Sequence, residues 1–227
     1  MRLYVGNKVY SSWSLRPWLV MKAKAIAFEE QLIPLRDPGS SDRIRQVSPS
    51  GKVPCLVDGK AVVWETTAIM EYLAEKFPKA EVWPEEQGAR AHARSVAAEM
   101  HAGFTSLRKH CPMVMTQRFK PQPLPTEVQA DVTRITQIWN EARTQFTGRS
   151  HPPFLYGEFT AADGMYAPVV SRFHTYGIRL DAVSQAYVDA MRAHPAYQEW
   201  LAGAVAEPWV LAQNETETII EDLRAKK

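Results

Sequence analysis

The chain has 227 residues, of which 45% are hydrophobic and 23% charged, and its formal net charge is +2. This balance of charge does not favour binding to nucleic acid or to an anionic membrane surface, and no apolar stretch approaches the roughly 20 residues that a membrane span needs. The two cysteines exclude a disulfide scaffold and a four-cysteine zinc site. We expect a globular protein of one large or two small domains, located in the cytoplasm.

A short apolar strand at residues 3–6 is followed by a serine-rich loop and a helix that continues from Leu15. Ser14 is the expected N-cap of this helix. A helix N-terminus favours an anion such as a thiolate, and a hydroxyl that donates a hydrogen bond to a thiolate lowers the thiol pKa. Ser11 and Ser12 are therefore candidate catalytic residues. A purely structural role in turn and cap formation fits the same spacing.

A second strand is expected at residues 28–35, followed by a polar loop and a short helix that ends before Ser48-Pro49. Next come two short apolar runs separated by Asp58-Gly59, which predict a hairpin. Pro54 begins the first run, where its missing N–H is tolerated and a cis bond can form. We predict a cis Val53-Pro54 bond and a free Val53 backbone, able to pair with a bound peptide.

Glu65 and Thr66 follow the hairpin and precede a helical apolar pattern. The Thr66 hydroxyl and the unpaired N–H groups of the first turn can hold a carboxylate, or Thr66 can act only as a helix cap. Lys52, just before the hairpin, can face the same carboxylate or lie in solvent. Backbone pairing at Val53 beside a carboxylate site indicates a small peptide ligand.

With this hairpin and the Glu65-Thr66 pair, residues 1–78 resemble the thioredoxin-like, glutathione-binding domain of the cytosolic glutathione transferases. The serine loop resembles that of serine-type, zeta-like bacterial members, and by position Ser11 matches the serine that meets the glutathione sulfur. The family usually has serine where this chain has Thr66, which retains the hydroxyl. Trp13 occupies the position of the reactive cysteine in cysteine-type relatives, which argues against thiol–disulfide chemistry on the enzyme.

Residues 79–86 lack periodicity and are the expected linker, and residues 87–227 are expected to form an all-helical domain. One helical segment is predicted over 86–115, a second from about 128 to 146, and two shorter helices over 182–193 and 196–205. Residues after Thr216 read as a charged tail.

The first of these segments carries Met100, His101, Phe104 and Arg108 at spacings that place the apolar pair on one helix face. By resemblance, this helix borders the electrophile pocket, with Arg108 near an anionic group. The alternative is that Met100 and Phe104 belong to the hydrophobic core.

Thr160 and Asp163 have the spacing of a capping box at the start of a helix. The same box opens the buried central helix in the second domain of the transferases, so Asp163 is expected to be structural.

The sequence contains no nucleotide-binding glycine motif and no HExxH metal motif, so neither a nucleotide cofactor nor a metal is expected. The resemblance implies a homodimeric glutathione transferase in which Lys52, Val53, Pro54, Glu65 and Thr66 bind glutathione. Its thiolate would attack a small electrophilic, largely apolar substrate. The alternatives are a glutathione-dependent isomerase of the maleylacetoacetate type, a non-catalytic binding or regulatory protein and, more weakly, a glutathione peroxidase or a reductase of disulfides.

Overall fold

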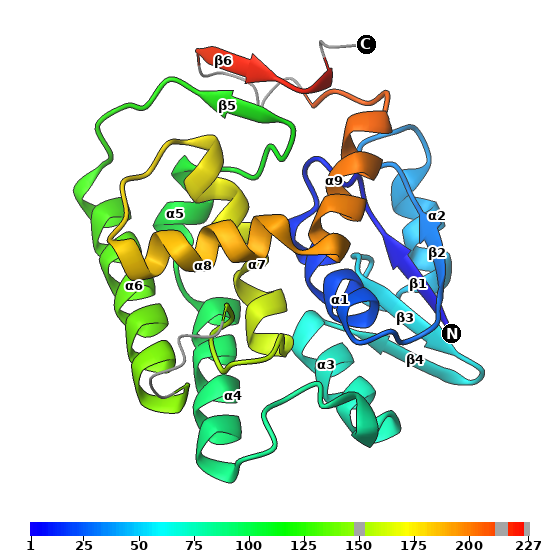
Figure 1. Ribbon diagram of the computed structural model, residues 1–227. Helices are drawn as coiled ribbons and strands as arrows, with labels where there is room; N and C mark the ends of the chain where they lie inside the picture. Colours follow the sequence, from blue (N-terminus) through cyan, green and yellow to red (C-terminus); the bar gives the residue numbers. More distant parts are fainter. Residues whose placement is uncertain (148–152, 212–217, 225–227) are drawn as a thin grey trace.

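The computed structural model describes residues 1–147, 153–211 and 218–224 (Figure 1). Its N-terminal part is an α/β unit. The elements in chain order are β1 (Arg2–Val5), α1 (Ser12–Ala23), β2 (Glu29–Leu32), α2 (Ser40–Val47), β3 (Cys55–Asp58), β4 (Ala61–Trp64) and α3 (Thr66–Lys76). A short 3-10 turn, η1 (Pro78–Ala80), follows α3.

The four strands form one sheet in the order β2-β1-β3-β4. The β1 strand pairs in parallel with β2 and antiparallel with β3, and β3 forms the predicted hairpin with β4. Leu3 pairs with Leu56, and both are fully buried under α1 and α3. Figure 1 shows α2 on the other side of the sheet from α1.

The C-terminal part is mostly helical. Its elements are α4 (Gln87–Ala102), α5 (Thr105–His110), β5 (Gln117–Phe119), α6 (Thr126–Phe146), α7 (Ala161–Thr175), α8 (Ala182–Ala193), α9 (Pro195–Ala206) and β6 (Ile219–Asp222). None of the described helices has both the length and the apolar content needed to cross a membrane. The thioredoxin-like unit followed by a helical domain confirms the predicted fold class. The boundaries of the 79–86 linker stay a prediction.

Helix α7 lies at the centre, and every residue in it except His174 is buried. It packs against α1 at Gly164, where an added Cβ would lie 2.4 Å from Val20 Cγ2 and 3.2 Å from the Arg16 carbonyl oxygen. Only glycine allows the two helices to approach so closely. Arg16 Nε then donates a buried hydrogen bond of 3.0 Å to the Met165 carbonyl oxygen.

The two halves also meet along α9. Trp200 Nε1 donates to the Lys8 carbonyl oxygen at 2.9 Å, and its ring lies edge-on to Trp18, with ring centroids 5.1 Å apart. The Glu207 carboxylate accepts a hydrogen bond from the Lys8 N–H at 2.6 Å. One cluster of buried apolar side chains runs from Leu3 in the sheet to Trp139 in α6. The hydrophobic core is therefore continuous across both halves.

The prediction of one helix over 86–115 was wrong. Helix α4 ends at Ala102, Phe104 has φ = 56°, and α5 begins at Thr105. Gly103 is a poor helix former, and Arg108 donates hydrogen bonds to the carbonyl oxygens of His101 and Gly103, which stabilises the end of α4. Met100 and Phe104 consequently do not share one helix face.

The prediction of a charged tail after Thr216 was also wrong where the chain is described, because β6 pairs antiparallel with β5. The pairing extends beyond the two strands: the Leu223 N–H donates to the Thr116 carbonyl oxygen at 2.9 Å. Ile219 and Ile220 remain exposed, so burial of apolar side chains does not account for the formation of β6. The strand is held by its backbone hydrogen bonds to β5.

The predicted capping box at the start of α7 is confirmed. The Asp163 carboxylate is fully buried and accepts hydrogen bonds from the N–H groups of Leu155, at 3.1 Å, and Thr160, at 2.8 Å, and from the Thr160 hydroxyl, at 3.0 Å. Burial raises the pKa of Asp163 to about 6, against the lowering effect of these hydrogen bonds. Asp163 thus anchors a loop and the start of the central helix.

We predict that Asp163→Ala lowers the free energy of unfolding at pH 7 by about 2–4 kcal/mol, because three buried donors lose their acceptor. Asp189→Ala, at an exposed carboxylate on α8, is the matched control and should change it by less than about 0.5 kcal/mol. Urea unfolding followed by circular dichroism measures both. Equal effects of the two substitutions would contradict the anchoring role.

Candidate functional site

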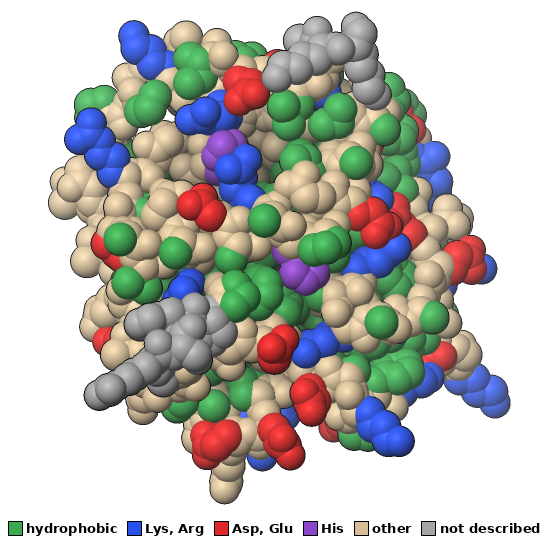
Figure 2. Space-filling model, viewed as in Figure 1, with side chains coloured by type: hydrophobic (Ala, Val, Ile, Leu, Met, Phe, Trp, Pro, Cys, Tyr) green, Lys and Arg blue, Asp and Glu red, His purple; other side chains and the backbone are tan. Residues whose placement is uncertain are grey.

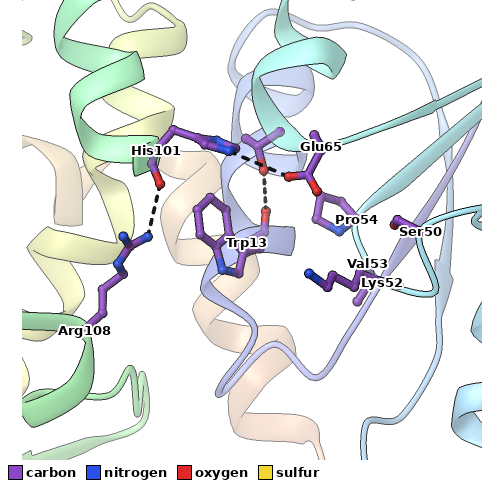
Figure 3. Close-up of a pocket in the computed structure, with 9 residues that line it drawn as sticks. Trp13, Ser50, Lys52, Val53, Pro54, Glu65, His101 and Arg108 are labelled. Carbon is purple, nitrogen blue, oxygen red and sulfur yellow. Dashed lines mark hydrogen bonds and ion pairs between the residues drawn. The ribbon is translucent and has the colours of Figure 1, made fainter. Parts of the chain in front are cut away.

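A cavity of about 370 Å³ lies between the α/β unit and the helical domain. It is lined by residues from α1, from the loop that leads into the β3–β4 hairpin, from the start of α3, and from α4 and α5, namely Trp13, Ser50, Lys52, Val53, Pro54, Glu65, Thr66, His101 and Arg108. Figure 3 shows Trp13 in the middle, with Lys52, Val53 and Pro54 on one side and His101 and Arg108 on the other.

The hairpin side of the cavity offers unpaired backbone groups. The Val53-Pro54 bond is cis, which confirms that prediction. Within the described part of the chain, the N–H and C=O of Val53 make no hydrogen bond. Next to them, α3 begins at Thr66, so the N–H groups of its first turn have no partner in the helix. This side can therefore pair with an extended backbone and hold a carboxylate.

Glu65 precedes α3 with φ = 66° and ψ = 130°, an uncommon backbone conformation for a residue with a side chain. The Thr66 hydroxyl is buried and donates a hydrogen bond of 3.5 Å to the Trp13 carbonyl oxygen. Thr66 therefore links the start of α3 to the first turn of α1 and also lines the cavity. No feature of the sequence predicted the conformation of Glu65.

The serines lie at the start of α1, but neither Ser11 nor Ser12 is among the residues that line the cavity. The helix begins at Ser12, so the assignment of Ser14 as N-cap was wrong. Instead, the Ser14 hydroxyl accepts hydrogen bonds from the Gly6 N–H at 3.0 Å and from the Ser11 hydroxyl at 2.8 Å. Ser12 is 8% exposed, at the first position of the helix.

The opposite side of the cavity comes from the end of α4 and from α5. The His101 ring lies edge-on to Trp13, with centroids 5.1 Å apart, and its Nε2 is 3.8 Å from Glu65 Oε2. The His101 Nδ1 is buried and has no partner in the described part of the chain. Burial lowers the pKa of His101, the Glu65 charge opposes this shift, and Arg16 and Arg108 add to it. The ring is therefore neutral at pH 7.

Two arginines lie against Trp13, and a third, Arg172, lies close enough to them for the charges to interact. The guanidinium carbon of Arg16 is 4.0 Å from the centroid of the Trp13 ring, and that of Arg108 is 5.4 Å from it. Burial, and after it Arg172 and Arg108, lowers the pKa of Arg16. Burial and Arg108 also lower the pKa of Arg172, to about 10. This mutual repulsion shows that the three charges share one region.

Among the described residues, no carboxylate lies within ion-pair distance of Arg16, Arg108 or Arg172. Arg16 is fully buried, and its Nη1 and Nη2 atoms have no hydrogen-bond partner within residues 1–147, 153–211 and 218–224. Buried charges normally have a partner, so this excess of positive charge is unusual. It makes the helical side of the cavity attractive to an anion.

The structure thus brings together Lys52, Val53, Pro54, Glu65 and Thr66 with His101 and Arg108. Met100 and Phe104 do not reach the cavity and belong to the core, because the chain turns at Gly103. Sequence reasoning missed Ser50 and Trp13 as lining residues. Trp13 occupies the position of the reactive cysteine in cysteine-type relatives, and this correspondence could have indicated that it lines the cavity. The functional roles of all these residues stay predictions.

No cluster of three or more His, Cys, Asp or Glu side chains able to hold a metal occurs in the described part of the chain. Cys55 is buried, and its thiol donates to the Val47 carbonyl oxygen at 3.3 Å.

Comparison with known proteins gives two family matches. Residues 10–76 match the N-terminal domain of glutathione S-transferase, and residues 90–203, half of the chain, match its C-terminal domain. The chain is 33% identical over 137 residues to glutathione S-transferase theta-3 of Mus musculus, which covers 56% of each protein. It is 29% identical over 105 residues to a probable maleylacetoacetate isomerase of Caenorhabditis elegans, which covers 46% of this chain and 48% of that protein.

The matched regions thus span about half the length of these curated relatives. A solved structure of a glutathione transferase homologue from Burkholderia GL BGR1, with bound glutathione, aligns with a TM-score of 0.67 at 23% identity. That alignment covers 91% of this chain and 98% of the other. The domain matches over 10–76 and 90–203, with the architecture described above, show that the chain belongs to the glutathione S-transferase family.

Proposed function

We propose that the protein is a glutathione transferase that adds the thiol of glutathione to a small electrophile. The observation that carries the proposal is the free Val53 backbone beside the open N-terminus of α3, in one cavity. The bound glutathione of the Burkholderia homologue supports the same ligand here. Bound glutathione would supply a thiolate nucleophile, and the chain's residues would bind it, orient it and stabilise its charge.

Each residue of the hairpin side then has a distinct role. Val53 pairs with the cysteinyl backbone of glutathione, and the first turn of α3 with Thr66 holds the γ-glutamyl carboxylate. Glu65 takes the γ-glutamyl amino group, and Lys52 reaches a carboxylate. Ser11, at the N-terminus of α1, donates to the thiolate after its hydroxyl turns from Ser14, and Ser12 is the alternative donor.

Calorimetric titration of glutathione, with absorbance of the bound thiolate followed against pH, tests this proposal. We expect wild-type protein to bind glutathione with a depressed thiol pKa, and Ser11→Ala to raise that pKa by about one unit, or roughly 1.4 kcal/mol. Ser95→Ala, an exposed serine on α4, is the matched control. A rise in Ser12→Ala alone would transfer the role to Ser12, and absence of glutathione binding would contradict the proposed function.

The electrophile that fits the helical side has an apolar body and an anionic group. The Trp13 ring offers a flat apolar surface, and Arg108 lines the cavity without a carboxylate partner among the described residues. The buried charges of Arg16 and Arg172 add to the positive potential. A carboxylate on the substrate would therefore be stabilised by a charge-assisted hydrogen bond to Arg108.

We predict that Arg108→Gln lowers kcat/KM for 4-chloro-3-nitrobenzoate about tenfold or more, but changes it less than about twofold for the neutral 1-chloro-2,4-dinitrobenzene. Arg108→Lys, which keeps the charge, should retain most of the activity with the benzoate. Arg45→Gln, at an exposed arginine on α2, should leave both substrates unaffected. Equal loss on both substrates would show that Arg108 acts only by supporting the end of α4.

The positive charge on the helical side of the cavity also favours a second candidate function, that of a glutathione-dependent isomerase. The Caenorhabditis elegans relative is named as a probable maleylacetoacetate isomerase, and such a substrate carries two carboxylates. Turnover of a maleyl-type substrate, without net consumption of glutathione, would identify this activity. A non-catalytic binding protein would bind glutathione without lowering its thiol pKa.

The charges around His101 give a separate test of the cavity. Because Glu65 raises the pKa of His101 and Arg108 lowers it, we predict that Glu65→Gln lowers this pKa further and Arg108→Gln raises it. NMR titration of the imidazole measures both, with Arg45→Gln as the control. Shifts in the same direction would contradict the arrangement of charges described above.

A homodimer and a cytoplasmic location complete the proposal. The exposed apolar side chains Val62 and Trp64, each about 40% exposed, lie on edge strand β4 beside α3. Contact between two copies across α3 and α4, as the family resemblance implies, would cover this surface.

A further inference from the structure

His101 on α4 and Glu65, directly before α3, face each other across the cavity between the two halves of the chain (Figure 3). His101 Nε2 lies 3.8 Å from Glu65 Oε2, which is too long for a hydrogen bond. Among the described residues, neither side chain makes a hydrogen bond. Two polar groups therefore lie side by side in the cavity with their hydrogen-bonding capacity unused.

Packing and a backbone hydrogen bond fix the position of the imidazole. Its ring lies edge-on to Trp13, with centroids 5.1 Å apart, and Arg108 donates to the His101 carbonyl oxygen at 3.3 Å. The Nδ1 atom is buried, so Nε2 is the ring nitrogen that a molecule in the cavity can reach. The nearby Glu65 carboxylate favours the neutral tautomer that carries its proton on Nε2. His101 therefore presents an N–H donor to the cavity.

A carboxylate bound at the start of α3 would have acceptor capacity left for this donor. The N–H groups of the first turn have no partner in the helix and can hold such an anion. The Thr66 hydroxyl, in contrast, is turned toward the Trp13 carbonyl oxygen, 3.5 Å away, and Thr66 is fully buried. Because a carboxylate offers about four lone-pair sites, there is room for a donor from outside the helix.

An α-amino-acid head group, with an ammonium and a carboxylate on one carbon atom, matches these protein groups. The ammonium can donate to Glu65 while the carboxylate accepts from His101 Nε2, each in a charge-assisted hydrogen bond of about 2.8 Å. Since the two charges share one carbon atom, they can reach two protein groups that lie only 3.8 Å apart. The γ-glutamyl end of glutathione carries such a head group.

The outer face of the molecule that Figure 2 shows has a different character. Basic and acidic side chains are interspersed there with apolar ones. Within the described residues of that face, neither sign of charge predominates. The paired donor and acceptor in the cavity are a more specific arrangement for a zwitterionic group.

We propose that His101 is a glutathione-binding residue whose Nε2 donates to the γ-glutamyl carboxylate. The γ-glutamyl head group then lies between Glu65, the first turn of α3 and His101, and glutathione connects the helical domain to the α/β unit. This role rests on the glutathione binding proposed above. It moves His101 from the electrophile pocket, where the family resemblance placed it, to the glutathione site.

Isothermal titration at pH 7 tests this role with glutathione and two analogues. γ-Aminobutyryl-cysteinyl-glycine lacks the γ-glutamyl carboxylate, and glutaryl-cysteinyl-glycine lacks the amino group. We expect His101→Phe, which keeps a ring against Trp13, to weaken binding of glutathione and of the glutaryl analogue about tenfold. It should change binding of the γ-aminobutyryl analogue less than about twofold, because that compound has no carboxylate for His101 to hold. Glu65→Gln should weaken the γ-aminobutyryl analogue and spare the glutaryl one.

Kinetics separate this role from one in the electrophile pocket. With 1-chloro-2,4-dinitrobenzene, His101→Phe should raise KM for glutathione about tenfold and leave KM for the electrophile within about twofold. His101→Gln, whose side-chain amide can donate from a similar position, should recover part of the affinity for glutathione. His110→Phe, at an exposed histidine on α5, is the matched control and should leave all affinities unchanged.

Equal loss of affinity for all three compounds would show that His101 only shapes the cavity, and would overturn the proposal. Tighter binding of glutathione by His101→Phe would show that the imidazole competes for Glu65, with the same consequence. Unchanged affinity would overturn the role of His101 and leave the transferase function intact, whereas wild-type protein that binds no glutathione would contradict both. Circular dichroism establishes that each variant is folded.

Discussion

The close contact of α1 with α7 at Gly164 determines the arrangement of the rest of the molecule. Because this residue has no side chain, the Arg16 backbone lies against α7 and Arg16 Nε reaches the Met165 carbonyl oxygen. The first turn of α1 is then fixed against the helical domain. Trp13 consequently faces the cavity while the guanidinium group of Arg16 lies beneath its ring. The site is built from both halves of the chain, and its geometry depends on this one helix pair.

This arrangement has a cost in stability that points to function. The buried Arg16 guanidinium group has two nitrogens without a partner in the part of the chain that the structure describes, which is unfavourable, and the nearby charges of Arg172 and Arg108 make it more so. An apolar side chain at position 16 would fill the same space without this penalty. Retaining a cation under the cavity is therefore understandable if an anion on the other side of the Trp13 ring benefits from its field. The active sites of enzymes often contain such unfavourable charges.

The parts of the fold that depend on local patterns were predictable from the sequence. The Asp58-Gly59 hairpin, the cis bond before Pro54 and the box of Thr160 and Asp163 are examples, since turn and cap chemistry is encoded within a few residues. The family resemblance also led to most residues of the cavity. The break at Gly103 was missed because it depends on Arg108 hydrogen bonds formed only once α5 folds back. Strand β6 was missed because its partner, β5, lies about a hundred residues earlier.

The continuous core has a further consequence, for how the protein folds. Trp18 in α1 and Trp200 in α9 pack on each other, and the same apolar cluster reaches Trp139 in α6. Neither half could therefore separate without exposing large aromatic surfaces to water. Two regions that match distinct family domains would then melt together, as one cooperative unit. An isolated copy of the sheet with its three helices would be aggregation-prone during synthesis until the later helices emerge and cover α1.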